Sequence, residues 1–231
     1  MKKLFICLPI LLIVLMSACK KDNYKSPDAE LSGNIVDAAT GKNVPQQTNT
    51  SGGYLQLFQT DYLKPSAIQT ALHPDGSYTR GFIFNGNYKV VPTGPFFYLD
   101  TVNINVSGSA KLDLKVIPYL TVTCELLSKT STSITVRVKV TQPVENTQKI
   151  ARVLAVAATF NTVDVNNYHG TRGLTNTESM ANSSVVSSSY DYTISALKPG
   201  TLYYVRGGGR TINTGNYYNY SPMLTVTTNS P

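Results

Sequence analysis

The residue types that most often perform acid–base, nucleophilic or metal chemistry are few and scattered in this chain. It has two histidines, His73 and His169, which are far apart in sequence, and a single histidine does not make a metal site. The 13 acidic residues show no paired motif of the kind that a glycosidase needs, and no serine lies in a G-x-S-x-G sequence. We therefore expect no catalytic residues, no metal, no cofactor and no enzymatic activity.

Tyrosine is the residue type whose number and placement suggest a binding chemistry. The chain has 15 tyrosines and no tryptophan. Aromatic rings stack against the apolar face of a sugar, and a tyrosine hydroxyl can bind its polar edge. Tyr217, Tyr218 and Tyr220 fall in a loop expected between the last two strands, so we predict an exposed ligand-binding platform there. Strand-edge packing is the alternative for these tyrosines, and core or interdomain packing is the simplest role for Phe96 and Phe97.

The N-terminal segment has the order of parts found in a bacterial lipoprotein signal. Lys2 and Lys3 precede an apolar run, residues 4–16, that is too short to span a bilayer, and two small residues then lead to Cys19. The pattern predicts that residues 1–18 are removed and that Cys19 is lipidated. The alternative is an ordinary cleaved signal followed by a chance cysteine.

The remaining composition agrees with an exported protein and argues against a nucleic-acid partner. Charged residues make up 14% of the chain, and the net charge of +7 is not concentrated in any run of like charges. Cys7 leaves with the signal, so Cys124 has no disulfide partner. Because Cys124 lies in an alternating strand pattern, we predict a buried structural thiol.

The first half of the mature chain reads as strands and turns. Residues 31–36 form a strand pattern, Thr40-Gly41 and Asp75-Gly76 are turn signals, and two alternating segments within residues 102–116 predict a closing hairpin. The predicted units are a lipidated tether at residues 19–28 and a first β-sandwich at residues 29–116.

The second half, residues 117–231, predicts another all-β domain. Pro118 would begin its first strand, and residues 134–140 alternate as a strand with one buried face. Residues 152–160 are a continuous apolar run that is typical of a central strand. Tyr203 follows a Pro-Gly turn and is expected to hydrogen-bond back to it.

Both halves resemble known sandwich families. The segment Gly33–Asp37 followed by Thr40-Gly41 is similar to the opening of the carboxypeptidase regulatory-like, or transthyretin-like, fold, and Leu197–Arg206 resembles the corresponding part of a fibronectin type III domain. As a whole, the chain resembles the domain-of-unknown-function 3823 family of lipoproteins from glycan-foraging Gram-negative bacteria. The segments that carry this resemblance are Cys19, Asp22–Tyr24, Gly33–Val36, Phe84–Tyr88 and Lys111–Tyr119.

The expected fold class is therefore all-β, with two β-sandwich domains in series after a cleaved lipoprotein signal peptide. The resemblance implies that the gene lies beside genes for an outer-membrane TonB-dependent transporter and a SusD-like glycan-binding lipoprotein. It supplies no catalytic residue. We expect a non-enzymatic lipoprotein, anchored to the outer membrane and preferably on its outer face, that assists glycan capture or import. The alternative is an interaction protein that docks on that complex without a glycan site.

Overall fold

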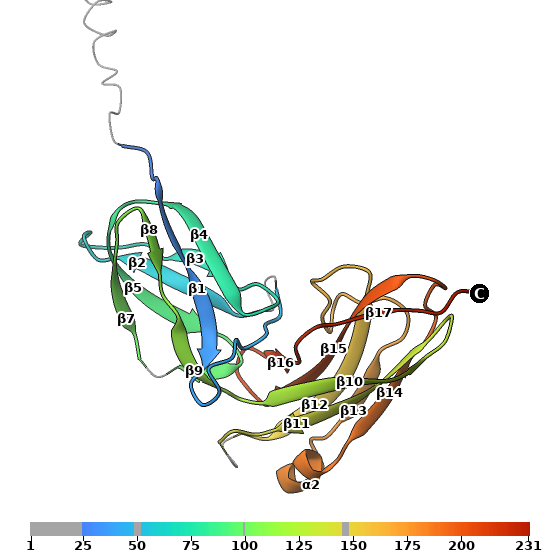
Figure 1. Ribbon diagram of the computed structural model, residues 1–231. Coiled ribbons are helices and arrows are strands. Elements are labelled where there is room, and N and C mark those ends of the chain that lie inside the picture. The colour runs from blue at the N-terminus through green and yellow to red at the C-terminus, as the bar shows by residue number, and fades with distance from the viewer. Residues whose placement is uncertain (1–24, 49–51, 99, 145–147) are drawn as a thin grey trace, which may run out of the picture.

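The computed structural model describes residues 25–48, 52–98, 100–144 and 148–231, and nearly all of its regular structure is strand. Figure 1 shows two layered β units that meet at an angle. The all-β prediction is confirmed for these residues, which form several sheets. The predicted signal peptide and Cys19 lie outside the described residues. Within the described part, no helix has the length and apolarity needed to cross a membrane.

The first sandwich packs a five-stranded sheet on a four-stranded sheet. In the five-stranded sheet, β1 pairs antiparallel with β4 and parallel with both β8 and β9, and β6 follows β9. Its strands are β1 (Ala29–Asp37), β4 (Ser77–Ile83), β6 (Phe96–Tyr98), β8 (Ser109–Lys111) and β9 (Leu114–Pro118). The facing sheet, in the order β3-β2-β5-β7, consists of β2 (Tyr54–Gln59), β3 (Ile68–Ala71), β5 (Gly86–Thr93) and β7 (Val102–Val106).

The hairpin predicted within residues 102–116 is wrong. β7 pairs with β5 in one sheet, whereas β8 and β9 pair with β1 in the other. Val106, Leu114 and Val116 are all buried in the same core, because the turn at Gly108 carries the chain from one layer to the other. The alternation of apolar and polar residues indicates which face of a strand is buried, but it does not indicate which strand pairs with it.

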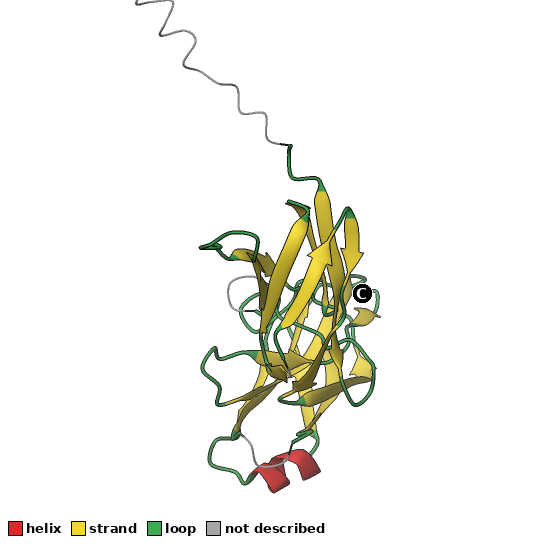
Figure 2. Ribbon diagram, turned by 90° about the vertical axis from the view of Figure 1, so that its left-hand side faces the viewer, coloured by secondary structure: helices red, strands yellow, loops and turns green. Residues whose placement is uncertain are grey.

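The second sandwich packs a three-stranded sheet, in the order β10-β11-β14, on a five-stranded sheet. In the larger sheet β13, β12 and β15 are neighbours, and both β16 and β17 pair with β15. Its elements are β10 (Thr121–Lys129), β11 (Ile134–Thr141), β12 (Ile150–Ala158), β13 (Gly173–Asn176), α2 (Asn182–Ser187), β14 (Tyr190–Ile194), β15 (Leu202–Thr211), β16 (Tyr218–Tyr220) and β17 (Leu224–Thr227). The single described helix, α2, lies at the end of the molecule opposite the chain start in Figure 2.

The central strand β12 is buried on both faces. The outer face of its sheet is therefore covered by other residues of the second domain. Val153, Ala155 and Ala157 face the core between the sheets. Leu154 and Val156 face the other way, into a second cluster that also contains Val163, Val165, Tyr218 and Tyr220. The outer face of the sheet therefore needs its own apolar cover, which the chain supplies from residues 163–165 and β16.

The tyrosine corner is confirmed. The Lys198 N–H donates a hydrogen bond to the Tyr203 hydroxyl over 2.9 Å, which fixes the turn before β15 to the strand itself. Tyr203 is buried in the second core. The same strand also carries the three glycines 207–209, which pair regularly with β12 and are covered by side chains on both faces.

The two sandwiches are joined with almost no linker. β9 continues to Pro118, which pairs with Phe96 in the first sandwich, and β10 begins at Thr121. Pro118 therefore ends a strand instead of beginning one, and the predicted boundary between residues 116 and 117 lies inside β9. Leu120 already belongs to the second core. Such a short connection brings side chains of both domains into contact.

Candidate functional site

Tyr218 and Tyr220 are not exposed, so the prediction of an exposed platform is wrong for both. Tyr218 is 4% exposed and Tyr220 is 2% exposed. Both lie on β16, whose side chains cover the outer face of β12 and β15. The Tyr220 hydroxyl accepts a hydrogen bond from the Val165 N–H, and burial raises the pKa of Tyr220 far above its ordinary value. These rings hold the second domain together and leave no face for a ligand.

Arg206 of β15 fixes one side of the junction between the domains. Its Nη1 donates to the Gln46 carbonyl at 2.9 Å, its Nη2 donates to the Pro74 carbonyl at 3.2 Å, and both acceptors belong to the first sandwich. The guanidinium also lies over the Tyr220 ring, 4.3 Å from its centroid. Burial lowers the pKa of Arg206 to about 10. A buried cation thus bridges the two domains through two carbonyl groups of the first sandwich, while the Tyr220 ring of its own domain covers the guanidinium.

Asn219 of β16 fixes the other side of the junction. Its Nδ2 donates to the Pro95 carbonyl over 3.0 Å, and its Oδ1 accepts from the Leu120 N–H, also over 3.0 Å. Asn219 is buried, so these bonds are shielded from water. One amide thus holds both the turn before β6 in the first sandwich and the start of the second sandwich, and this fixes the angle between the sandwiches locally.

Tyr217 lines a groove at this second side of the junction. The groove has a volume of about 530 Å³. One wall comes from the first sandwich and the linker, through Thr93, Phe96 and Tyr119, and the other comes from Gln148 and the loop before β16. Tyr217 and Tyr119 are half-buried, so each ring is supported by the protein and partly open to solvent. The described residues that line the groove include no lysine, arginine, histidine, aspartate or glutamate.

The loop that carries Tyr217 is held in one shape. The Asn213 side chain accepts from the Tyr217 N–H at 2.8 Å and donates to the Tyr217 carbonyl at 3.0 Å. Asn216 adopts a left-handed conformation at φ 52°, and its side chain accepts from Arg210 at 2.8 Å. A side chain at Gly215 would lie 1.9 Å from Cε2 of Tyr217. The ring therefore occupies space that only glycine leaves open.

Two further tyrosines approach Tyr217, Tyr54 from the first sandwich and Tyr119 from the linker. Burial is the main cause that raises the pKa of Tyr217, and the nearby hydroxyls of Tyr54 and Tyr119 add to it. Tyr119 is itself braced by Phe97, edge to face, with the ring centroids 4.7 Å apart. The sequence analysis missed Tyr54 and Tyr119, because neither lies in an aromatic cluster of the sequence and the groove forms only when the domains meet.

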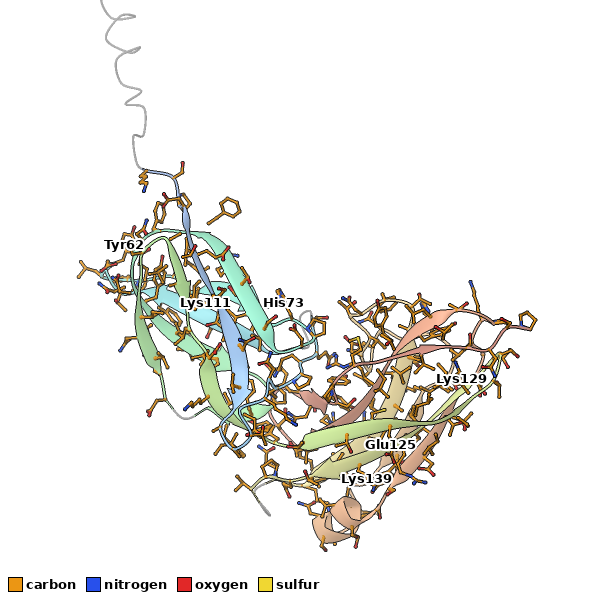
Figure 3. All side chains as sticks on the ribbon, viewed as in Figure 1. Tyr62, His73, Lys111, Glu125, Lys129 and Lys139 are labelled. Atoms are coloured by element: carbon orange, nitrogen blue, oxygen red, sulfur yellow. The ribbon has the colours of Figure 1, made fainter. Side chains whose placement is uncertain are left out.

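A larger and more apolar cleft opens on the Arg206 side of the junction. Its volume is about 800 Å³, and its apolar lining includes Pro74, Tyr204 and Met223. Polar groups at the cleft include His73 and Asp75, and Figure 3 shows His73 on the flank of the first sandwich that faces the second.

The two histidines, Cys124 and Phe96 make contacts that stabilise the fold. His73 Nδ1 is 3.1 Å from Ser77 Oγ in a turn, and His169 packs edge-on against Phe160. Burial raises the pKa of Cys124 to about 11, which disfavours the thiolate that a nucleophile needs. Phe96 is buried in the first core, in agreement with its packing role. No group of three or more metal-ligating residues occurs among the described residues.

Comparisons with known proteins bear on the first domain and on the fold. Residues 29–117 match the family model for the N-terminal domain of DUF3823, described as a protein of unknown function. No curated protein matches the sequence.

Three similar crystal structures share the fold. A DUF3823 family protein from Bacteroides uniformis has 22% identity and a TM-score of 0.75, and the match covers 87% of this chain and 100% of that one. A DUF3823 family protein from Parabacteroides merdae has 22% identity and a TM-score of 0.70, with 88% and 100% covered. A second Bacteroides uniformis protein, described as a candidate carbohydrate binding protein, has 20% identity and a TM-score of 0.70, with 87% and 99% covered.

Proposed function

We propose, from the match of residues 29–117 to the model for the N-terminal domain of DUF3823, that the chain is a non-enzymatic outer-membrane lipoprotein that assists capture or import of a glycan. The glycan would bind in the groove between the two sandwiches, against Tyr217 and Tyr119. This moves the predicted site away from Tyr218 and Tyr220 while keeping Tyr217.

The composition of the groove is the observation that carries this proposal. Half-buried tyrosine rings lie beside the side chains of Gln148, Thr214 and Thr93. Rings supply an apolar face for a sugar ring, and amides and hydroxyls supply donors and acceptors for its hydroxyl groups. Since the described lining holds no charged side chain, it suits a neutral ligand that is bound through stacking and hydrogen bonds.

The rigidity of the groove adds support. Both walls are tied across the junction by Asn219, and Tyr217 is clamped by Asn213. A site that is ordered before the ligand arrives loses less conformational entropy on binding. Independent support comes from the Bacteroides uniformis protein of the same fold that is described as a candidate carbohydrate binding protein.

The proposed location depends on Cys19. If Cys19 carries the lipid, we expect Cys19→Ala to release the mature protein from membranes and to abolish palmitate labelling, because several acyl chains at about 0.8 kcal/mol per buried CH₂ hold such an anchor. Labelling that persists in the Cys19→Ala variant would contradict the proposal. The outer face of the outer membrane, next to a TonB-dependent transporter and a SusD-like lipoprotein, is the place that the family resemblance favours.

One observation favours the alternative function, in which the protein docks on such a complex without binding glycan. The cleft on the Arg206 side is larger than the groove and mostly apolar, and its lining includes Pro45, Pro222 and Met223. Such a surface suits a segment of a protein partner better than it suits a sugar.

Calorimetry against a panel of soluble glycans tests the proposed site. We expect the mature chain to bind at least one glycan, and Tyr217→Ala to weaken that binding by about tenfold or more, since a stacked ring contributes roughly 1–2 kcal/mol. Tyr62→Ala is the matched control, because Tyr62 is 57% exposed at the far end of the first domain. A broad panel without any binding, or equal loss in both variants, would favour the docking function.

A further inference from the structure

Four large apolar side chains are exposed at the end of the first sandwich where the chain enters it. The exposed fractions are 104% for Leu63, 85% for Phe82, 57% for Tyr62 and 42% for Phe84. Tyr62 and Leu63 lie in the loop between β2 and β3, Phe82 lies near the end of β4, and Phe84 lies in the turn before β5. We call these four residues the apolar tip. The groove and the cleft are lined by residues of both sandwiches, and Figure 1 shows that the sandwiches meet at the opposite end of the first one.

Hydrogen bonds join the segments that form the apolar tip. Asp61, next to Tyr62, accepts from the Asn87 N–H at 2.9 Å and from the Asn87 side chain at 3.1 Å. The Tyr88 hydroxyl donates to the Phe84 carbonyl at 2.8 Å. The loop after β2 and the turn before β5 are therefore neighbours.

The chain start is tied to the same end. The Asn85 side chain donates to Asp28 at 3.0 Å, and Ala29 pairs with Ile83. Figure 3 shows Tyr62 at the end of the sandwich where the described part of the chain begins. Any N-terminal anchor would thus pull this end of the molecule, and not the groove, toward its attachment point.

Phe82 has a backbone conformation that core packing does not explain. Its φ is 57°, which is unusual for a bulky residue. The pairing of β1 with β4 is irregular between Ala29 and Leu31, so an extra residue of β4 is accommodated there and the Phe82 ring points into solvent. Strained backbone that exposes an apolar ring indicates a role for that ring outside the folded core.

We propose that the apolar tip inserts into the lipid surface to which the protein is anchored, and so sets the orientation of the molecule on the membrane. This inference rests on the lipid anchor of the proposed function. Residues 19–28 can span at most about 35 Å, which keeps the end that carries the apolar tip close to the bilayer. Exposed Lys64, beside Leu63, suits the headgroup layer of an anionic lipid surface. With this end on the membrane, the junction and its groove would face away from it.

The absence of tryptophan allows a single-residue reporter. We would compare Leu63→Trp with Leu202→Trp, because Leu202 is also exposed, at 47%, but lies on β15 of the second sandwich. The lipidated protein would be reconstituted in vesicles of phosphatidylethanolamine and phosphatidylglycerol that contain brominated acyl chains. We expect blue-shifted, quenched emission from Leu63→Trp alone. No quenching in either variant, or equal quenching in both, would overturn the inference.

A second arm removes the lipid, so that the apolar tip and the anchor are tested separately. In the Cys19→Ala background, the protein should no longer be retained on membranes but should still bind the same vesicles weakly at high lipid concentration. Phe82→Ser should lower this partition coefficient about tenfold, the effect of one large apolar side chain. Leu202→Ser, the control, should leave it unchanged.

The two arms separate the possible failures. Equal partitioning of the Phe82→Ser and Leu202→Ser variants, or no partitioning of the parent, would overturn the inference while leaving the lipid anchor intact. If the wild type carries no palmitate label but Phe82→Ser still lowers partitioning, the lipid anchor alone would be refuted.

Discussion

The two sides of the domain junction join the same pair of sandwiches in different ways. On one side a buried guanidinium, Arg206, donates to carbonyls of the first domain, and the depression beside it is large and apolar. On the other side a buried amide, Asn219, makes the connection, and the smaller depression beside it is lined by tyrosines, amides and hydroxyls.

This difference shows that the volume of a depression and its suitability for a ligand are separate properties. The larger cleft of about 800 Å³ exposes mainly apolar surface, although Lys42 and Asp75 also line it. The groove of about 530 Å³ places donors and acceptors around partly open rings. For a glycan, the arrangement of polar groups around an aromatic surface matters more than the space, because each sugar hydroxyl that loses water must find a partner.

The largest expected effect concerns Arg206. Arg206→Ala should lower the free energy of unfolding by about 2–4 kcal/mol, because several buried carbonyl groups and the Tyr220 ring lose their partner. Urea unfolding measures the change. The control is Arg137→Ala, since Arg137 makes a shorter, bidentate pair with Asp191 at the surface and should matter little. If both substitutions lower the free energy of unfolding by the same amount, then burial does not make the hydrogen bonds of Arg206 more stabilising than a surface ion pair.

The next effect concerns Asn219 on the groove side. Asn219→Ala should lower the free energy of unfolding by about 1–2 kcal/mol, because the Leu120 N–H and the Pro95 carbonyl are left without partners. It should also weaken glycan binding, since both walls of the groove would loosen. Asn105→Ala, at an exposed amide pair with Asn87, is the control for stability. If the Asn219→Ala protein is destabilised but binds glycan with full affinity, then binding in the groove does not depend on the hydrogen bonds of Asn219 across the junction.

A smaller effect is expected at Gly215. Gly215→Ala should reduce glycan affinity by about tenfold with little loss of stability, because the displaced group is a half-exposed ring and not the backbone. Gly81→Ala is the control, as the nearest atom to its added side chain is Glu30 Oε2 at 3.9 Å. If Gly215→Ala binds as tightly as the wild type, the position of the Tyr217 ring does not determine affinity.

The smallest expected effect is that of pH. Because burial and neighbouring hydroxyls raise the pKa of Tyr217, its hydroxyl stays protonated to beyond its ordinary value of about 10. Glycan affinity should therefore be constant from about pH 6 to pH 9 and should fall only above about pH 10. Tyr217→Phe should remove the alkaline fall while retaining most of the stacking. A change of affinity near neutral pH would contradict the prediction that the Tyr217 hydroxyl is the titrating group of the site.

Much of the fold could be predicted from local pattern. Alternation identified β11, the continuous apolar run identified β12, and a turn signal identified the corner at Tyr203. The partner of a strand was harder to predict, as the assignment of β7 and β8 to different sheets shows. Periodicity contains no information about which layer the chain enters after a turn.

The site could be predicted only in part. The sequence pointed to Tyr217, but it also pointed to Tyr218 and Tyr220, which are buried because the outer face of β12 needs an apolar cover. A second buried face on β12 was implied by its uninterrupted apolar run, and that signal could have been used. The contributions of Tyr54 and Tyr119 could not be predicted, because they depend on the angle at which the domains meet.

Nuclear magnetic resonance of labelled side chains tests most directly whether a glycan occupies the groove and not the cleft. Once residues 1–18 are removed, the methionines are Met180 and Met223, and Met223 lines the cleft. Methionine methyl groups and tyrosine rings would be labelled and titrated with the glycan that binds most tightly. We predict that the resonances of Tyr217 and Tyr119 shift while the Met223 methyl group does not. Shifts at Met223 with unchanged tyrosine resonances would contradict the proposed site.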